Sequence, residues 1–433
     1  MQNLPEQFID RMKKRLGEGF PAFLRAYENP PYKGLRVNTQ KISKEEFWAI
    51  SPIMLEQVPW AENGFYITAE KAGAHPYHFA GLYYLQEPSA MCAAPMLEIS
   101  AAKHVLDLCA APGGKTTQIA ARMDRGAILV ANEIDGSRAK ILSQNIERLG
   151  IANCAVTNAT PKQLVENFPE YFDAILVDAP CSGEGMFKKE PNALTHWSPQ
   201  NVALCAARQK EILDDAASML TSGGEIVYST CTFAEEEDEW QIADFLKRHP
   251  EFALLEIKKI LPHEERGEGH FAARLKKISH SSLQREAPKI RAYPLRVNAQ
   301  AEKAYRAFAE DFFVSAPQGA ITTLSDGRMY LVPTGMPAFD VRVMRLGVEL
   351  GEWDGKLIRP AHALAMAFGT HARRKVKLSL EEVKKYLRGE TVEAEVENGW
   401  CVVFVEEFPL GLGKAVNGTV KNHLPKGLRL VRA

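Results

Sequence analysis

The sequence lacks any apolar run of about 18 residues, the length that a helix needs to cross a bilayer. Its first residues, MQNLPEQFIDRMKKRLG, lack the apolar core of a secretion signal and have the pattern of an amphipathic helix. Internal repeats and low-complexity tracts are absent as well. We therefore expect a cytoplasmic protein with no membrane partner, built from ordinary globular domains.

Cysteine is scarce and scattered along the chain. The seven cysteines are odd in number and widely spaced, and no CxxC pair occurs. This pattern argues against a disulfide framework and against a zinc site, and it favours reduced thiols, most of them in the core. We expect no bound metal. The seven positions are Cys92, Cys109, Cys154, Cys181, Cys205, Cys231 and Cys401.

An excess of charge of either sign is also missing. The formal net charge is −1 and the pI is about 6.8, so the chain as a whole shows no basic footprint of the kind typical of nucleic-acid-binding proteins. The distribution is uneven, however, because residues 355–433 hold 14 Lys and Arg against 8 Asp and Glu, a surplus of 14 − 8 = 6. This surplus marks the last segment as a candidate for contact with an acidic partner.

The middle of the chain alternates between buried strands and helices. A length of 433 residues is too great for a single core and predicts roughly two to four domains. Continuous apolar runs separated by amphipathic helical segments predict βαβ units and a doubly wound, mostly parallel sheet, an α/β fold. Two late strands, FALLEIKKI and HFAARLKKI, are expected to give this sheet a mixed edge. The expected strands of the parallel part are 104–110, 127–135, 154–158, 173–178 and 225–233.

The flanking regions have a mixed α+β pattern. Helix signals occupy 5–16 and 18–28, and GLRVNT at 34–39 has the pattern of a strand or turn. Residues 278–290 are polar and predict a linker. We expect four domains, with the boundaries 1–90, 91–278, 288–350 and 355–433.

A glycine turn lies between the first strand and its helix. Ala111, Pro112, Gly113, Gly114 and Lys115 fit neither the P-loop nor the GxGxxG spacing. Such a turn brings backbone N–H groups to a ligand and suits a nucleoside carrying a carboxylate, and a plain tight turn is the alternative.

The second strand ends in an acidic pair. Glu133, at the end of this strand, is placed to hydrogen-bond both hydroxyls of a ribose, whereas Asp135 is placed to cap the next helix. Taken with the glycine turn, the pair favours an adenosine-type cofactor without a 2′-phosphate.

Two strands end in a thiol. The stretch FDAILVDAPCSGEGMF carries Asp178 and Cys181, and YSTCTF carries Cys231. These ends become neighbours if 178 and 229 lie on adjacent parallel strands. Two such thiols could form a redox pair, a soft metal site, or a nucleophile with a helper. A nearby cation such as Lys115 favours the thiolate that a nucleophile needs.

The motifs together resemble a known family. LDLCAAPGGKT, ANEID, DAPCSGEGMF and YSTCTF are similar, in order and in spacing, to the Nol/Nop/Sun family of RNA (cytosine-5) methyltransferases. GLRVNT and LQEPSAM fit as well, and a cysteine motif on each of two strands is highly specific to this family. The tail, FPLGLGKAVNGTVKNHLPKGLRL, resembles the PUA-like domain of the bacterial 16S rRNA methyltransferase F subgroup.

The resemblance implies the fold and the reaction. The fold is that of a Rossmann-like class I methyltransferase domain, with an N-terminal RNA-binding region at 1–90, a methyltransferase domain at 91–278, an intermediate domain at 288–350 and a PUA-like domain at 355–433. The activity is transfer of a methyl group from S-adenosyl-L-methionine to cytosine C5 in RNA, most simply 16S rRNA or the small ribosomal subunit. Cys231 corresponds to the nucleophile that attacks C6, Cys181 to the thiol that assists product release, and Asp178 to the acid that holds the base.

The remaining site residues follow from the same resemblance. Lys115 corresponds to a lysine near the target base. Asn158 is the candidate for the adenine contact, since the family often has an acid or an amide there and VTNAT offers no Asp. Arg138 corresponds to a further cofactor-side position, and a pairing on the helix surface is the alternative. The residues expected to bind the cofactor are Ala111, Pro112, Gly113, Gly114, Lys115, Glu133, Arg138, Asn158 and Asp178.

The expected partner is structured RNA, and a monomer is expected because no coiled-coil pattern demands a dimer. Candidate RNA contacts are Arg373, Arg374, Lys375, Lys377, Lys414, Lys421 and Lys426. Two other interpretations compete: a methyltransferase for protein or a small molecule, and a non-catalytic RNA-binding protein with a relic pocket. The paired cysteine motifs and the tail argue against the first, and the intact set of Cys231, Cys181, Asp178 and Lys115 argues against the second.

Overall fold

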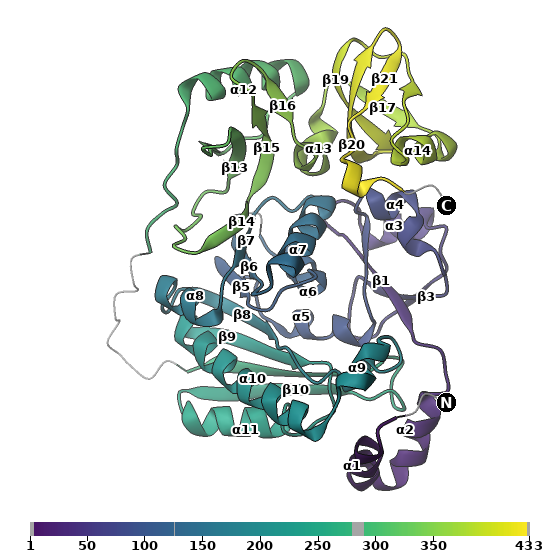
Figure 1. Cartoon of the computed structure of the whole chain (residues 1–433), viewed down its shortest axis with the longest axis vertical. Coiled ribbons are helices and arrows are strands. Elements are labelled where there is room, and N and C mark those ends of the chain that lie inside the picture. Colours follow the sequence, from purple (N-terminus) through teal and green to yellow (C-terminus); the bar gives the residue numbers. More distant parts are fainter. Residues whose placement is uncertain (1–3, 125, 279–289, 431–433) are drawn as a thin grey trace.

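The structure is a computed structural model of the chain, and it describes residues 4–124, 126–278 and 290–430 (Figure 1). Four sheets are present in these ranges, and the largest has eight strands. No helix in the described ranges is long and apolar enough to cross a membrane. The predicted linker at 278–290 falls almost entirely outside the described residues.

The N-terminal region is a small antiparallel sheet with short helices. The strand order is β2-β3-β1-β4. The second predicted helix begins later than expected, at Phe20, because Gly17 (φ 51°) and Gly19 form a separate 3₁₀ turn before Pro21. The elements are α1 (Glu6–Leu16), α2 (Phe20–Ala26), β1 (Lys33–Val37), α3 (Lys44–Ile50), β2 (Leu55–Gln57), β3 (Gly64–Ile67), α4 (Pro76–Phe79) and β4 (Tyr83–Leu85).

The central sheet has the order β10-β11-β9-β8-β5-β6-β7-β14. Strands β9, β8, β5, β6 and β7 are parallel, and β10 and β11 run antiparallel, which confirms the predicted mixed edge. Because the chain runs from β5 to β7 in one direction and then returns to β8, the order reverses between β5 and β8. The strands are β5 (His104–Asp107), β6 (Ile128–Asn132), β7 (Cys154–Asn158), β8 (Phe172–Asp178), β9 (Leu220–Thr230), β10 (Phe252–Ile260), β11 (His270–Lys277) and β14 (Arg342–Leu346).

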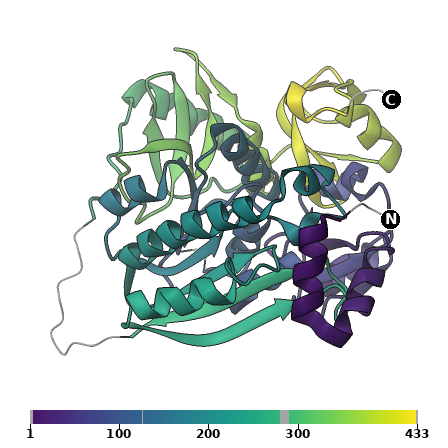
Figure 2. The same cartoon turned by 60° about the horizontal axis from the view of Figure 1, so that its bottom comes forward.

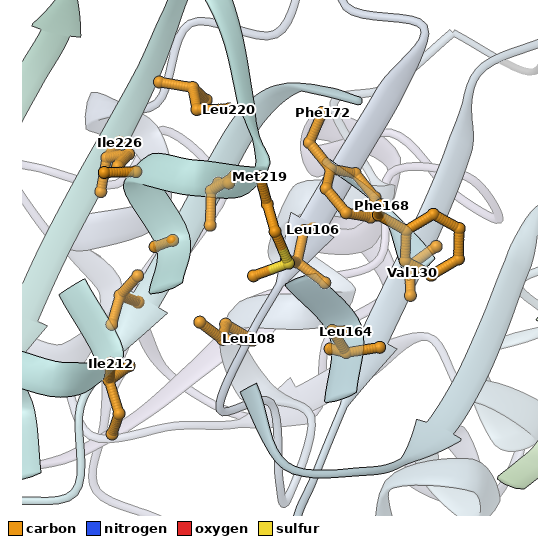
Figure 3. Close-up of a cluster of buried hydrophobic side chains, with 14 of the residues drawn as sticks. Leu106, Leu108, Val130, Leu164, Phe168, Phe172, Ile212, Met219, Leu220 and Ile226 are labelled. Atoms are coloured by element: carbon orange, nitrogen blue, oxygen red, sulfur yellow. The ribbon is translucent and has the colours of Figure 1, made fainter. Parts of the chain in front are cut away.

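Helices cover both faces of this sheet. One face packs against α8 and α10, and the other against α5, α6 and α7. Figure 3 shows the first of these cores, with Leu106, Val130 and Ile226 of the strands beside helix residues such as Leu164 and Ile212. Burying each such side chain contributes roughly 1.5–3 kcal/mol. The helices are α5 (Ala93–Met96), α6 (Gly114–Ala120), α7 (Gly136–Leu149), α8 (Pro161–Asn167), α9 (Pro191–His196), α10 (Pro199–Met219) and α11 (Glu239–Arg248).

Strand β14 is the unexpected member of the sheet. It lies within the segment 288–350 that was expected to form an intermediate domain, yet it pairs antiparallel with β7, Leu346 opposite Ala155. Leu346 and Val343 pack into the methyltransferase core. The rest of the segment forms a separate sheet of order β12-β13-β15-β16. Its elements are α12 (Ala299–Phe312), β12 (Ala320–Thr323), β13 (Arg328–Val332), β15 (Val348–Trp353) and β16 (Ile358–Pro360).

The C-terminal sheet, of order β17-β19-β20-β21-β18, packs against the N-terminal region. Leu35 and Tyr83 share one apolar core with Tyr386 and Val403, and the yellow strands lie beside α3 and α4 in Figure 1. The tail is therefore fixed to the start of the chain. Its elements are α13 (His362–Phe368), β17 (Lys375–Leu378), α14 (Leu380–Leu387), β18 (Val392–Glu393), β19 (Gly399–Val405), β20 (Phe408–Val416) and β21 (Thr419–Asn422).

Candidate active site

The two predicted thiols meet at the carboxyl ends of β8 and β9. Asp178 lies opposite Ser229 in the parallel ladder, so the loops that follow the two strands start side by side. The Sγ atoms of Cys181 and Cys231 are 3.3 Å apart, and both residues are partly exposed. The expectation that the two strand ends are neighbours is confirmed. This edge adjoins the point where the strand order reverses, which is where ligands bind in open α/β sheets.

Asp178 forms an ion pair with Lys115 of α6. Lys115 Nζ lies 2.8 Å from Asp178 Oδ2, and the Ser229 hydroxyl donates to Oδ1 at 2.9 Å. Burial raises the pKa of Asp178, but the charge of Lys115 and the hydrogen bonds outweigh it and leave that pKa below its ordinary value. Burial lowers the pKa of Lys115, and Asp178 more than compensates, so that pKa is raised. Both groups are therefore ionised at neutral pH, at the strand ends from which the two thiol loops start.

The two thiols differ in their surroundings. The hydrogen bond with Cys231 and burial together raise the pKa of Cys181 well above its ordinary value, and the charge of Glu237 acts in the same direction. The Cys181 thiol therefore keeps its proton and can donate a hydrogen bond to the sulfur of Cys231. Charge on Cys231 in turn raises the pKa of Lys115, because the ammonium faces that sulfur.

A buried hydrogen-bond network joins the two thiol loops from behind. The hydroxyls of Ser182 and Thr232 are 2.8 Å apart, and the backbone N–H of Ser182 donates to Glu237 Oε2 at 3.0 Å. Gln209 of α10 donates to the same oxygen at 2.8 Å and to the carbonyl of Pro180 at 3.0 Å. Burial raises the pKa of Glu237 to about 7. The relative position of Cys181 and Cys231 is thus held by side chains that are not themselves exposed.

The first helix of the chain braces the same loops. Arg11 of α1 forms an ion pair with Glu184, which is fully buried and also accepts from Trp197 Nε1 at 2.7 Å. The other Glu184 oxygen accepts from the backbone N–H of Phe233 at 3.0 Å. Arg15 donates to the Phe233 carbonyl and pairs with Glu239 at 2.8 Å. Figure 2 shows these purple helices against the teal methyltransferase domain.

The glycine turn packs against α7. Gly113 has φ 109°, a conformation that favours glycine, and a Cβ there would lie 3.1 Å from Leu142 Cδ1, so a side chain would be both strained and tightly packed. Arg138 spans the turn and the second strand, donating to the Ala111 carbonyl at 2.7 Å and lying 3.4 Å from Glu133 Oε2. Glu133 Oε1 accepts from the backbone N–H of Asp135 at 2.9 Å.

Asn158 is placed differently from the other predicted cofactor residues. It ends β7, and its amide nitrogen donates to the carbonyls of Glu133 at 2.8 Å and Ile134 at 2.9 Å. It therefore fixes the loop that carries Glu133, whereas an adenine contact would need its carbonyl oxygen. The structure brings together the turn, Glu133, Arg138 and Asn158 along three adjacent strand ends, and Asp178 joins them across β5.

Several residues at the site were not expected from the sequence. Ser229 binds Asp178, and the fully buried Asp107 accepts from Thr116 at 2.6 Å while burial raises its pKa to about 7. His270 of β11 lies 4.0 Å from Asp178 Oδ1. Asp107, Ser229 and Glu184 lie within the sequence motifs, although nothing in the pattern indicated these contacts. Arg11 and His270 reach the site through tertiary packing alone.

The candidate RNA-binding cations are engaged to different degrees. Arg374 has a largely buried side chain that pairs with Asp311 at 2.7 Å, which gives it a structural role between domains. Lys377 forms an ion pair with Glu407. Lys414 lies over the Trp400 ring at 5.5 Å and Lys375 over Phe404 at 5.8 Å. A half-open cavity of about 500 Å³ lies elsewhere, lined by residues such as Arg291, Arg328 and Phe339, and none of the predicted site residues lines it.

Four family models match successive parts of the chain. They describe the N-terminal domain of 16S rRNA methyltransferase RsmF (residues 4–88), the 16S rRNA methyltransferase RsmB/F (residues 94–276), the RsmF rRNA methyltransferase first C-terminal domain (residues 307–368) and the methyltransferase RsmF PUA domain (residues 373–430). The chain is 34% identical to ribosomal RNA small subunit methyltransferase F of Vibrio cholerae serotype O1 (strain M66-2) over 467 residues, 98% of each chain. It is 35% identical to the protein of that name from Klebsiella pneumoniae (strain 342), over 98% of this chain and 96% of the other.

Solved structures give the same fold. A methyltransferase homolog protein from Pyrococcus horikoshii is 29% identical with a TM-score of 0.58, over 64% of this chain and 96% of its own. NSun6 from Pyrococcus horikoshii, in a crystal structure with the S-adenosylmethionine analogue SFG, is 20% identical with a TM-score of 0.57, over 64% of this chain and 98% of its own. Its likeness shows the fold alone. The chain therefore belongs to the RsmB/F family of S-adenosylmethionine-dependent 16S rRNA methyltransferases, with the N-terminal, first C-terminal and PUA domains of RsmF.

Proposed function

We propose that the protein methylates carbon 5 of cytosine in 16S rRNA through a covalent adduct between the base and Cys231. The observation that carries the proposal is the pairing of two thiols at 3.3 Å beside an ionised Lys115–Asp178 pair. A redox pair would need no carboxylate and ammonium at the same strand ends. A soft metal site would need further ligands, and among the described residues no group of three or more His, Cys, Asp or Glu is arranged to hold a metal.

The residues that line the strand ends fit the cofactor. The glycine turn at Gly113 lies between β5 and α6, and Glu133 follows β6, so both stand at strand ends, where a nucleoside cofactor would be bound. Arg138 is placed over Glu133 and the turn, where it would close on the cofactor. These residues would hold S-adenosylmethionine, which would supply an electrophilic methyl group for the reaction.

The base is activated by addition of a thiolate. Cytosine C5 is a poor nucleophile, and attack of the Cys231 thiolate on C6 forms a C6–S bond that moves electron density to C5 and to N3. The ionised Asp178 accepts a hydrogen bond from the exocyclic amino group, and Lys115 places a cation beside the charge that accumulates on the ring. Because the target base is stacked in RNA, it has to be flipped into this pocket, at a cost of a few kcal/mol.

Product release then requires removal of the C5 proton and cleavage of the C6–S bond. After C5 has been methylated, a base removes the C5 proton, the C6–S bond breaks, and Cys231 leaves as a thiolate. Cys181 is the group nearest to that sulfur, and its raised pKa keeps it protonated. It can therefore stabilise the departing thiolate by donating a hydrogen bond, so the two thiols act in opposite halves of the reaction.

The test separates the two thiols. Cys181→Ala is expected to trap a covalent RNA–protein adduct that survives denaturing electrophoresis, whereas Cys231→Ala should form none. Cys401→Ala, which removes a buried thiol of β19 in the C-terminal sheet, is the matched control and should behave as wild type. An adduct with Cys231→Ala in place of Cys181→Ala would reverse the two assignments. Bisulfite sequencing of 16S rRNA from cells with and without the protein tests the substrate, and unchanged cytosines would refute it.

A further inference from the structure

His270 occupies a place at the active site to which the proposed reaction gives no role. It begins β11, which runs antiparallel to β9 with Phe271 opposite Thr230 and Ala272 opposite Ser229. Continuing this register by one residue places His270 beside Cys231. Residues directly opposite each other in a ladder point to the same face, and side chains two apart along a strand do so too. His270 therefore shares the face on which Ser229 holds Asp178.

The imidazole is buried and has no hydrogen-bond partner. His270 is only 2% exposed, and neither ring nitrogen is hydrogen-bonded to any described residue. The nearest charged atom is Asp178 Oδ1, 4.0 Å from Nε2, which is too long for a hydrogen bond. A buried polar group without a hydrogen-bond partner destabilises the fold. The partner strand offers Ile260 at the paired position, so the packing of the strand gives no reason for a polar side chain here.

The imidazole ring of His270 is uncharged at neutral pH. Burial lowers the pKa of His270 to about 3, and the charge of Lys115 acts in the same direction, while Asp178 opposes both. A neutral imidazole carries one N–H donor and one acceptor nitrogen. It can thus donate one hydrogen bond without adding a second cation to that of Lys115.

We propose that His270 is a substrate-contacting residue that donates a hydrogen bond to the 2-carbonyl oxygen of the target cytosine. The inference rests on the proposed function, in which Asp178 holds the amino edge of the base. The 2-carbonyl is the next hydrogen-bonding atom beyond N3, and it takes up charge when the thiolate adds to C6. A donor aimed at this oxygen therefore stabilises the adduct more than the free base. The bound base also satisfies an otherwise unpaired ring nitrogen.

Two variants separate the hydrogen bond from the packing. His270→Phe fills the space without a donor, and His270→Gln keeps an N–H donor. Removing one such donor typically lowers the rate by about 10²-fold, so kcat/KM on 16S rRNA is expected to fall by about this factor in His270→Phe and by less than about tenfold in His270→Gln. Calorimetric affinity for S-adenosylmethionine should stay at the wild-type value in both, and the melting temperature should not fall in either; in His270→Phe it should rise, because the unsatisfied polar group is gone.

The decisive measurement changes the substrate atom. A 16S rRNA ligated to carry 2-thiocytidine at the methylated position replaces the carbonyl oxygen with a much weaker acceptor. The wild type and His270→Gln should lose rate on this RNA by about tenfold or more, whereas His270→Phe, having no donor to lose, should treat both RNAs alike. An equal loss in wild type and His270→Phe would overturn the inference, as would a His270→Gln rate as low as that of His270→Phe. Failure of the proposed function would show separately, as absence of cytosine methylation by the wild type.

Discussion

The contact between Arg11 and Glu184 predicts a coupling between the start of the chain and the chemistry. Glu184 is fully buried, while Arg11 is 26% exposed at its side chain and reaches it from α1. Removing one partner of a buried pair costs about 3–5 kcal/mol. Arg11 is partly hydrated, and Glu184 keeps its bonds from Trp197 and Phe233, so we expect Arg11→Met to cost about 2 kcal/mol, less than that range because solvent screens the pair.

The assay is a double-mutant cycle of Arg11→Met, Glu184→Gln and the double variant, followed by urea unfolding and methyl transfer. Glu184→Gln removes the buried charge, so the double variant should lose about 1–2 kcal/mol less than the sum of the single losses. Trp197 is part of the contact, and its fluorescence reports the local transition. Because Glu184 ties the Cys181 loop to Phe233, kcat should fall while affinity for S-adenosylmethionine is kept. Additive losses of unfolding free energy in the cycle would refute the coupling between Arg11 and Glu184. An affinity for S-adenosylmethionine that falls as much as kcat would refute its effect on the chemistry.

Two further predictions concern the network and the glycine turn. In the folded protein the pKa of Glu237 is raised to about 7 from 4.5, so between these pH values the folded state holds a proton that the unfolded state releases. The stability that Glu237 contributes is therefore present below about pH 4.5. It is lost as pH rises to about 7, and the loss is about 3 kcal/mol. Glu237→Gln should flatten this part of the stability-versus-pH curve, and an unchanged slope would argue against it. Gly113→Ala places a Cβ 3.1 Å from Leu142 at φ 109°, and calorimetry should show at least about a tenfold loss of S-adenosylmethionine affinity, whereas Gly126→Ala, with open space around it, should bind as wild type.

Sequence patterns predicted the parallel sheet and the two thiol loops because both depend on local signals. An apolar run that ends in Asp178 or Ser229 indicates a strand end, and the carboxyl ends of parallel strands share one edge. The roles of Cys181, Cys231 and the cofactor residues stay predictions that rest on the resemblance. His270 and Arg11 could not be predicted, since each reaches the site from an element whose position is set by tertiary packing alone.

The domain limits were harder to predict for the same reason. The segment 288–350 has its own helix and strands. Nothing in its sequence pattern distinguishes β14, which pairs with β7 in the central sheet, from β15, which pairs with β13 in the separate sheet. Likewise, the core that Leu35 shares with Tyr386 and Val403 is formed by residues more than 300 positions apart. Deleting 355–433 would therefore uncover apolar surface of the N-terminal region, and RNA contacts of the tail are better tested by single substitutions such as Lys421→Ala.

The pairing of β14 with β7 has a consequence for synthesis of the chain on the ribosome. Strand β7 ends at Asn158 and its partner begins at Arg342, so 183 residues (159–341) lie between the two. Translation adds about 5–20 residues per second, so β14 is synthesised roughly 10–40 s after β7. During that time the edge of β7 presents unpaired N–H and C=O groups, the kind of edge that recruits other chains. The nascent protein passes through a state in which its methyltransferase sheet is open on one side, and holdase chaperones acting on translating ribosomes would find their target there.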